Sequence, residues 1–264
     1  MSPWSILLLI WLLAVVMMTI GWLWQRRHRN ASNVDVLWSA GLGVAALLLA
    51  AAGEGAAAPR LALALAGGFW SARLAIHLWR RMHGAAEDGR YRALRQRWHD
   101  APLKWFGLFQ LQALLIPLFA LPYVAVAANP RSFTPALASG AIVWVLAVTG
   151  ETIADAQLAR FRARPANHGK TCRQGLWRYS RHPNYFFEWL HWFAYVLFAV
   201  GSPLWWLAWT GPIVMYGFLR YLSGIPFTEQ QALRTRGDDY RAYQQQTPML
   251  FPRFPRSSVK KVRP

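Results

Sequence analysis

Long apolar stretches, separated by short segments that hold nearly all of the charge, constrain this chain more than any other feature of its sequence. The stretches cover residues 4–24, 34–53, 60–79, 105–128, 136–156, 184–200 and 203–222. A helix needs about 20 apolar residues to cross the hydrocarbon core of a bilayer. We therefore predict an all-α, polytopic integral membrane protein with seven transmembrane helices. Pro117 and Pro122 are expected to kink the fourth helix.

Lysine and arginine are distributed unequally over the connecting segments. Segments 25–33, 80–104 and 157–183, with the chain beyond 222, contain 25 of the 29 Lys and Arg residues. The connections expected on the opposite side contain only Arg60 and Arg131. The positive-inside rule then places the N-terminus outside and the C-terminus in the cytoplasm. The first stretch has no small-residue cleavage signal, and we interpret it as a retained anchor.

Composition narrows the classes of function further. Charged residues make up 15% of the chain, whereas soluble domains average roughly 25%. The formal net charge of +18 lies in short blocks next to apolar runs, which favours a membrane setting and not nucleic acid binding. Cys172 is the one cysteine, so an intrachain disulfide is impossible and no zinc cluster or other metal site is expected. We predict one transmembrane domain over 1–253 and a basic, disordered tail over 254–264.

Ionisable residues inside the predicted spans fall at the cytoplasmic ends of the helices. Because buried charge in a bilayer is costly, such groups usually face one another or water. A hydrated cavity that opens to the cytoplasm is therefore expected. The structural alternatives are snorkelling of Asp35 and Arg220 to the interface and a packing pair of Glu188 with His191. The residues concerned are Asp35, Arg73, His77, Glu151, Asp155, Glu188, His191 and Arg220.

The segment from 157 to 183 is rich in cations, aromatic rings and hydrogen-bonding side chains. It holds seven Lys and Arg residues, which suits a polyanionic ligand such as a nucleotide cofactor. Pro183 favours a helix start, where free backbone N–H groups can bind phosphate. The alternative interpretation is an ordinary basic loop attracted to anionic lipid.

The string Gly175-Leu-Trp-Arg-Tyr-Ser-Arg-His-Pro-Asn-Tyr-Phe-Phe-Glu188 closely resembles the signature of the steroid 5α-reductase C-terminal superfamily. Its bacterial branch of steroid 5α-reductase-like (DUF1295) membrane proteins is the most similar. The resemblance is strong from residue 150 onward and looser before that. It implies that the 150–253 half binds NADPH and that the protein lies in a bacterial inner membrane. Membrane methyltransferases carry similar Arg-His-Pro motifs.

The resemblance also implies roles for individual residues. Asp155, Arg162, Asn184 and Arg220 match family residues that contact the cofactor. Weaker cofactor-binding correspondences are Lys170, Tyr179, Tyr185, Glu188 and Tyr240. In the steroid enzymes a Glu and a Tyr hydrogen-bond the carbonyl oxygen of the substrate. In this sequence Asp35 is nearest the position of that Glu. When the sequence is aligned on Arg73, Trp70 occupies the position of that Tyr, and His77 lies one helical turn beyond Arg73. The predicted catalytic set is therefore Asp35, Trp70, Arg73 and His77.

The reaction that the resemblance implies is NADPH-dependent reduction of a carbon–carbon double bond conjugated to a ketone, in a lipophilic, steroid-like enone drawn from the membrane. Hydride goes to the β-carbon, and a donor stabilises the charge that develops on the carbonyl oxygen. A Gly-x-Gly-x-x-Gly turn is absent, so a Rossmann cofactor site is not expected. One alternative is an S-adenosylmethionine-dependent methyltransferase, although Glu229 is followed by Gln230 and not by a second Glu. The other is a seven-helix receptor; residues 203–222 contain no Lys to attach retinal.

Overall fold

The computed structural model describes residues 2–84, 86–222 and 224–254, and within them every regular element is helical. Two compact units can be distinguished. Unit 1 consists of Met1–Ile142 and Trp192–Val214, and unit 2 consists of Val143–His191 and Met215–Pro264. Most of the predicted cofactor-binding half therefore lies in unit 2.

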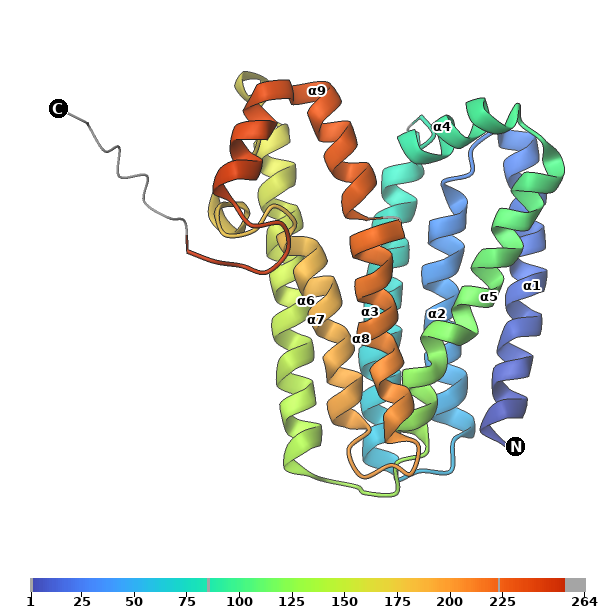
Figure 1. Ribbon diagram of the computed structural model, residues 1–264. Helices are drawn as coiled ribbons and strands as arrows, with labels where there is room; N and C mark the ends of the chain where they lie inside the picture. Colours follow the sequence, from blue (N-terminus) through green and yellow to red (C-terminus); the bar gives the residue numbers. More distant parts are fainter. Residues whose placement is uncertain (1, 85, 223, 255–264) are drawn as a thin grey trace. The chain divides into compact units, whose positions relative to one another are not determined.

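Unit 1 is built on four long helices that run side by side, α1 (Pro3–His28), α2 (Asn33–Ala52), α3 (Ala57–Met82) and α5 (Pro102–Ala127) (Figure 1). The short helix α4 (Gly89–Trp98) lies across the end at which α1 finishes. Ser2 caps α1 by accepting a hydrogen bond from the Ser5 backbone N–H at 3.1 Å. Helix α5 continues through Pro117 and Pro122, which membrane helices tolerate when neighbouring groups satisfy the freed carbonyls.

Small residues bring α2 and α3 close together. A Cβ added at Gly43 would lie 2.9 Å from Ser71 Cβ, and one added at Gly67 would lie 2.6 Å from Ala46 Cβ. Helices in membranes associate largely through such close backbone packing, because lipid gives them little hydrophobic drive to associate. The two glycines therefore fix the distance between α2 and α3.

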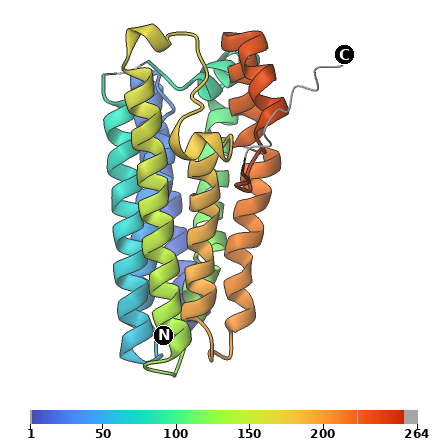
Figure 2. The same ribbon diagram turned by 90° about the vertical axis from the view of Figure 1, so that its left-hand side faces the viewer.

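Unit 2 is formed by the last part of α6 (Pro135–Arg162), the first part of α7 (Pro183–Phe198) and the helix α9 (Ile225–Gln246). Helices α6 and α7 run side by side in both views of the molecule (Figure 2). The segment between them has two short 3₁₀ turns, η1 (Pro165–Asn167) and η2 (Gly175–Arg178). Gly237 has φ +52°, a value that glycine adopts readily, and it kinks α9.

Among the described residues, five helices are long and apolar enough to cross a membrane, namely α1, α2, α3, α5 and α6. This result is consistent with an integral membrane protein. The sixth predicted span is represented by α7, which has 16 residues.

Residues 203–222, expected as one helix, instead form the 3₁₀ segment η3 (Trp205–Trp209), α8 (Thr210–Gly217) and the π-helical segment η4 (Phe218–Leu222). Pro212 falls in the first turn of α8, where a missing N–H costs no hydrogen bond, so it favours a new helix start at this point.

Two helices were not expected from the sequence. Helix α4 lies in the basic 80–104 connection, and α9 lies beyond the last apolar stretch. Both are polar and therefore give no transmembrane signal. Of the tail predicted to be disordered, Phe254 is described and exposed, and residues 255–264 lie outside the described residues.

Candidate functional site

Asp35, the first of the predicted catalytic residues, is held by α4. Its Oδ1 accepts a hydrogen bond from the Tyr91 hydroxyl at 2.7 Å, and its Oδ2 pairs with Arg90 at 2.9 Å. Arg90 also pairs with Asp88 at 3.1 Å. Burial, followed by the negative charge of Asp35, raises the pKa of Tyr91 well above its usual value. The phenol therefore remains a donor, and both oxygens of Asp35 are used to fasten α4 to α2.

Trp70 lies in the aromatic core of unit 1. Its side chain is 0% exposed, and its ring packs edge-on to Trp192 with 5.9 Å between centroids. Trp192 in turn stacks with Tyr123 at 6.0 Å and contacts Phe119 at 5.3 Å. These contacts give Trp70 a packing role in the fold.

Arg73 and His77 lie one turn apart on α3, toward its C-terminal end. Arg73 is half-buried, and His77 is exposed. Within the described part of the chain, the His77 ring makes no hydrogen bond. Its two nitrogens are therefore open to a ligand.

In unit 2, Glu229 of α9 holds the Arg-His-Pro motif in place. Its Oε1 accepts from Arg181 Nε at 2.7 Å and from His182 Nε2 at 3.1 Å. The same oxygen accepts from the Tyr240 hydroxyl at 3.3 Å, and Oε2 accepts from Gln244 at 2.9 Å. The kink at Gly237 allows residues eleven positions apart on α9 to meet in this way. Glu229 is thus the centre of a network that was not identified from the sequence.

The electrostatics of this network follow from burial and from charge pairing. Burial alone would raise the pKa of Glu229, but the hydrogen bonds from His182 and Arg181 lower it to about 2. Burial lowers the pKa of His182, so the imidazole is neutral at pH 7 and donates its Nε2–H to Glu229. Burial, with the nearby Glu229 charge, raises the pKa of Tyr240. One carboxylate is therefore surrounded by three donors and a cation.

Two of the predicted cofactor residues contact each other directly. Asn184, at the start of α7, donates to Asp155 Oδ1 of α6 at 3.2 Å. Tyr185 follows, stacked on His182 with 5.4 Å between ring centroids and with its hydroxyl 3.2 Å from Thr228 Oγ1. The Asn184–Asp155 bond links α6 to α7, and the Tyr185 contacts link α7 to α9.

The remaining predicted cofactor residues are spread through unit 2. Arg162 and Lys170 are exposed. Tyr179 packs against Phe254 with 5.6 Å between centroids, and the Arg220 guanidinium lies 5.1 Å from the centre of the Tyr221 ring. The backbone carbonyl of Glu188 is 2.6 Å from His191 Nδ1.

A small hollow of about 260 Å³ lies between the end of α6 and the turn before η2. The residues that line it are Gln157, Arg160, Phe161, Arg164, Gln174 and Gly175. Gln157 is fixed because its Oε1 accepts the Leu176 backbone N–H at 2.8 Å. Within the described ranges, neither arginine forms an ion pair. The hollow is therefore lined by two arginines that form no ion pair there and by a phenylalanine.

Comparison of the sequence with known proteins identifies the family to which the chain belongs. Residues 21–247 match the family described as "Protein of unknown function (DUF1295)". The chain belongs to the DUF1295 family. A Schizosaccharomyces pombe protein described as "Uncharacterized protein C594.04c" is 30% identical over 265 residues, covering 86% of this chain and 74% of the relative. No solved structure matches the chain.

In this DUF1295 protein, the sequence-predicted residues fall into two groups. Unit 1 contains Asp35, Trp70, Arg73 and His77, and unit 2 contains the nine predicted cofactor residues. Sequence reasoning missed Arg160 and Arg164 as a pair, although their spacing of four residues near the end of a helix would have indicated it.

Proposed function

We propose that this DUF1295 protein is an NADPH-dependent oxidoreductase that reduces the carbon–carbon double bond of a lipophilic enone, such as a 3-oxo-Δ4-steroid. The observation that carries the proposal is the hollow beside Arg160 and Arg164, with its unpaired cations next to an aromatic ring. Guanidinium groups bind phosphate through paired, charge-assisted hydrogen bonds. An aromatic face suits a nucleobase or ribose.

The residues of unit 2 fit the anionic part of such a cofactor. Ligand pockets usually have volumes of roughly 300–1,000 Å³, so a hollow of about 260 Å³ suits one phosphorylated sugar and not a whole dinucleotide. Exposed Arg162 and Lys170 would extend the cationic surface around it. We assign Asp155, Asn184, Tyr185 and Arg220 to further contacts with the same cofactor, on the resemblance set out above. When bound, NADPH would supply hydride for the β-carbon of the enone.

Within unit 1, we assign His77 as the proton donor and Arg73 as the group that orients the carbonyl oxygen. Negative charge develops on that oxygen during the reduction, and a positioned donor stabilises it. Asp35 is less suited, because both of its oxygens already accept hydrogen bonds from α4. Trp70 is enclosed by aromatic neighbours. His77 has ring nitrogens free for this task.

The topology that we propose has seven spans, with the N-terminus outside and the C-terminus cytoplasmic, in a bacterial inner membrane. Helix α7 would be the sixth span, and the run from η3 through α8 to η4 would be the seventh. The distribution of Lys and Arg supports this orientation. The cationic surface of unit 2 then faces the cytoplasm, where NADPH is available.

Binding of the cofactor can be tested without knowledge of the substrate. Purified protein in detergent should melt several degrees higher with excess NADPH than with the same concentration of S-adenosylmethionine, because a ligand that binds only the folded state stabilises it. Differential scanning fluorimetry measures both shifts. The opposite ranking would favour the methyltransferase, and no shift with either ligand would contradict the cofactor assignment.

The double variant Arg160→Ala/Arg164→Ala is expected to weaken NADPH binding by about a hundredfold. Each charge-assisted hydrogen bond to an exposed site contributes about 1.5 kcal/mol, the lower end of its usual range, and about 1.4 kcal/mol corresponds to a factor of ten in affinity. Isothermal titration calorimetry measures the change. The matched control is Arg80→Ala/Arg97→Ala, which removes two exposed arginines from unit 1. Equal loss in both variants would show a nonspecific effect of net charge.

A further inference from the structure

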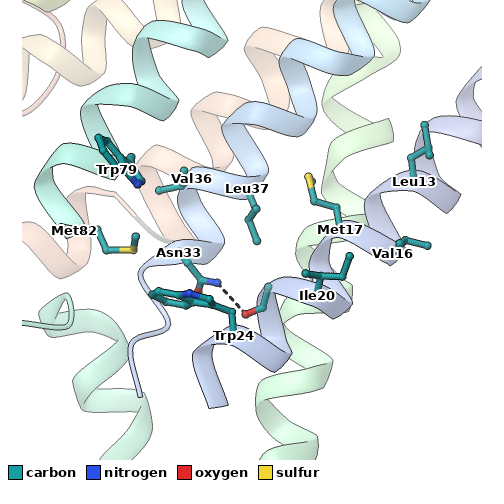
Figure 3. Close-up of a pocket in the computed structure, with 11 residues that line it drawn as sticks. Leu13, Val16, Met17, Ile20, Trp24, Asn33, Val36, Leu37, Trp79 and Met82 are labelled. Atoms are coloured by element: carbon teal, nitrogen blue, oxygen red, sulfur yellow. Dashed lines mark hydrogen bonds between the residues drawn. The ribbon is translucent and has the colours of Figure 1, made fainter. Parts of the chain in front are cut away.

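A cavity of about 500 Å³ lies in unit 1, between α1, the start of α2 and the end of α3 (Figure 3). Most of its wall is apolar, with Leu13, Val16 and Ile20 from α1, Leu37 from α2 and Met82 from α3. Val16 is 58% exposed and Ile20 is 61% exposed, and in a bilayer the exposed apolar side chains of a spanning helix contact lipid. The cavity is therefore accessible from the hydrocarbon of the membrane.

The length of the cavity matches one leaflet of a bilayer. Its α1 wall extends from Leu13, near the middle of that helix, to Trp24, near the basic end. This part of the helix rises about 16 Å, at 1.5 Å per residue. The hydrocarbon core of a bilayer is about 30 Å thick, so one leaflet contributes about 15 Å. An acyl chain can therefore lie along this wall while the headgroup of the same lipid stays beside Trp24.

Two tryptophans provide hydrogen-bond donors at that end of the cavity. Trp24 of α1 and Trp79 of α3 both line it, and Figure 3 shows both rings at the end away from Leu13. Both side chains are exposed, and within the described part of the chain neither indole N–H donates a hydrogen bond. Because an indole N–H can only donate, a suitable partner is an acceptor such as a phosphate or ester oxygen.

Basic side chains follow Trp24 on α1. The His28 ring stacks on the Trp24 ring with 4.2 Å between centroids. Arg27 lies three residues after Trp24 and seven after Ile20, so it shares the helix face that lines the cavity. Arg27 is exposed and forms no ion pair among the described residues. A positive charge therefore lies on the cavity face of α1, one turn beyond the apolar wall.

The acids at this end of unit 1 already have arginine partners, and Arg27 is not one of them. The ion pairs are Asp35–Arg90, Glu87–Arg95, Asp88–Arg81 and Asp100–Arg29, with N···O distances of 2.9, 2.7, 2.8 and 2.9 Å. The charge of Arg27 is therefore available to an anion from outside the chain.

The neighbouring arginine belongs to a different face of α1. The Arg26 guanidinium lies 5.1 Å from the centre of the Trp22 ring. The Trp22 indole donates to the Pro102 carbonyl oxygen of α5 at 3.3 Å, and neither Trp22 nor Pro102 lines the cavity. Of two adjacent arginines in α1, one is thus on the cavity face and the other on the α5 side.

We infer that this cavity binds one molecule of an anionic phospholipid from the bilayer. One acyl chain lies along the α1 wall, and the phosphate lies beside Arg27 and the indoles of Trp24 and Trp79. Basic pockets between transmembrane helices bind anionic lipid headgroups in this way. None of the residues assigned above to catalysis or cofactor binding lines the cavity, and the inference does not depend on the proposed reaction.

The test compares phosphatidylglycerol with phosphatidylcholine of the same acyl chains. Both lipids have a phosphate, but choline neutralises its charge. Delipidated protein in detergent, without NADPH, is titrated with each lipid, and native mass spectrometry measures the dissociation constant of the first lipid bound. Phosphatidylglycerol is expected to bind about tenfold more tightly, the effect of one charge-assisted contact. Glycerol 1-phosphate, which has the phosphate without acyl chains, should not bind.

A pair of arginine variants separates this site from general attraction between basic residues and anionic lipid. Arg27→Gln should bind the two lipids equally. Arg26→Gln is the matched control, because it removes the same charge from the adjacent position, and it should keep the tenfold preference. Equal loss of preference in both variants would overturn the proposal.

A second pair of variants tests the apolar wall. Val16→Trp fills the cavity from its exposed side and should abolish the binding of the first phosphatidylglycerol molecule. Leu8→Trp is the control, since Leu8 is a 55% exposed residue of the same helix that does not line the cavity. Unchanged binding in Val16→Trp would overturn the proposal. Equal binding of the two lipids to the native protein, or binding of glycerol 1-phosphate as tight as that of phosphatidylglycerol, would overturn it as well.

Discussion

Replacement of His77 by phenylalanine is expected to lower the turnover of an enone substrate by about 10²–10⁴-fold, the usual contribution of a positioned proton donor. The ring keeps its size, but it can no longer donate to a carbonyl oxygen. Because His77 is exposed and makes no hydrogen bond among the described residues, the variant should fold normally. Consumption of NADPH with a 3-oxo-Δ4-steroid such as progesterone, followed at its absorbance maximum, measures the loss.

The matched control is His83→Phe, six residues further along the chain. His83 is exposed and packs against Trp79 with 4.9 Å between ring centroids, and no role in the reaction is assigned to it. This variant should retain turnover. The thermal shift with NADPH should be the same in both variants, because His77 belongs to unit 1 and the proposed cofactor residues belong to unit 2. Full activity of His77→Phe would remove His77 from the proposed mechanism.

The second large effect is expected for Glu229→Gln, which should reduce the stability of unit 2 by about 3 kcal/mol. Glu229 accepts from three side chains through one oxygen and from Gln244 through the other. Removing one partner of a buried ion pair leaves the other charge uncompensated, at a cost of roughly 3–5 kcal/mol. Arg181, whose side chain is 11% exposed, is that charge. Hydrogen exchange of the amides in residues 176–182 and α9 measures the change.

The same network predicts how stability depends on pH. The carboxyl pKa of Glu229 falls from its ordinary 4.5 to about 2 on folding, so its contribution is present above pH 4.5 and is lost as the pH falls toward 2. The pKa of His182 is lowered from 6.5. The unfolded chain therefore takes up a proton first, and stability also declines below about pH 6.5.

A matched variant separates this network from general acid sensitivity. Asp238→Asn removes an acid from the same helix whose side chain is 93% exposed. It should keep the native pH profile in urea unfolding, whereas Glu229→Gln should lose the decline between pH 4.5 and 2. Identical profiles for the two variants would exclude the network as the cause.

The five helices that are long and apolar enough to cross a membrane were predictable, because long apolar runs with few charges usually form such helices. The limits of α1, α2, α3, α5 and α6 each contain the stretch predicted from hydrophobicity, except for single residues at the ends of α2 and α5. Helices α4 and α9 were missed because they are polar and have no long apolar run. The only sequence signals for them are the residues at their N-terminal ends. Asp88 caps α4 by accepting the Arg90 backbone N–H, and Pro226 lies in the first turn of α9.

The candidate site was predicted less completely, because its contacts join residues far apart in the chain. Asp35 was identified as an intramembrane acid, but its partner Arg90 lies 55 residues away in a helix that was not expected. In the sequence, Glu229 was considered only because Gln230, and not a second Glu, follows it. Its partners Arg181 and His182 are 48 and 47 residues away. No local pattern specifies such pairs.

The close packing of α2 on α3 limits how molecules can reach the interior of unit 1. Since Gly43 and Gly67 let the two backbones approach closely at two points, separating these helices would break both contacts. A lipid-soluble compound moving in from the bilayer will therefore not pass between α2 and α3. A route from the bilayer into unit 1 would therefore have to lie between another pair of helices.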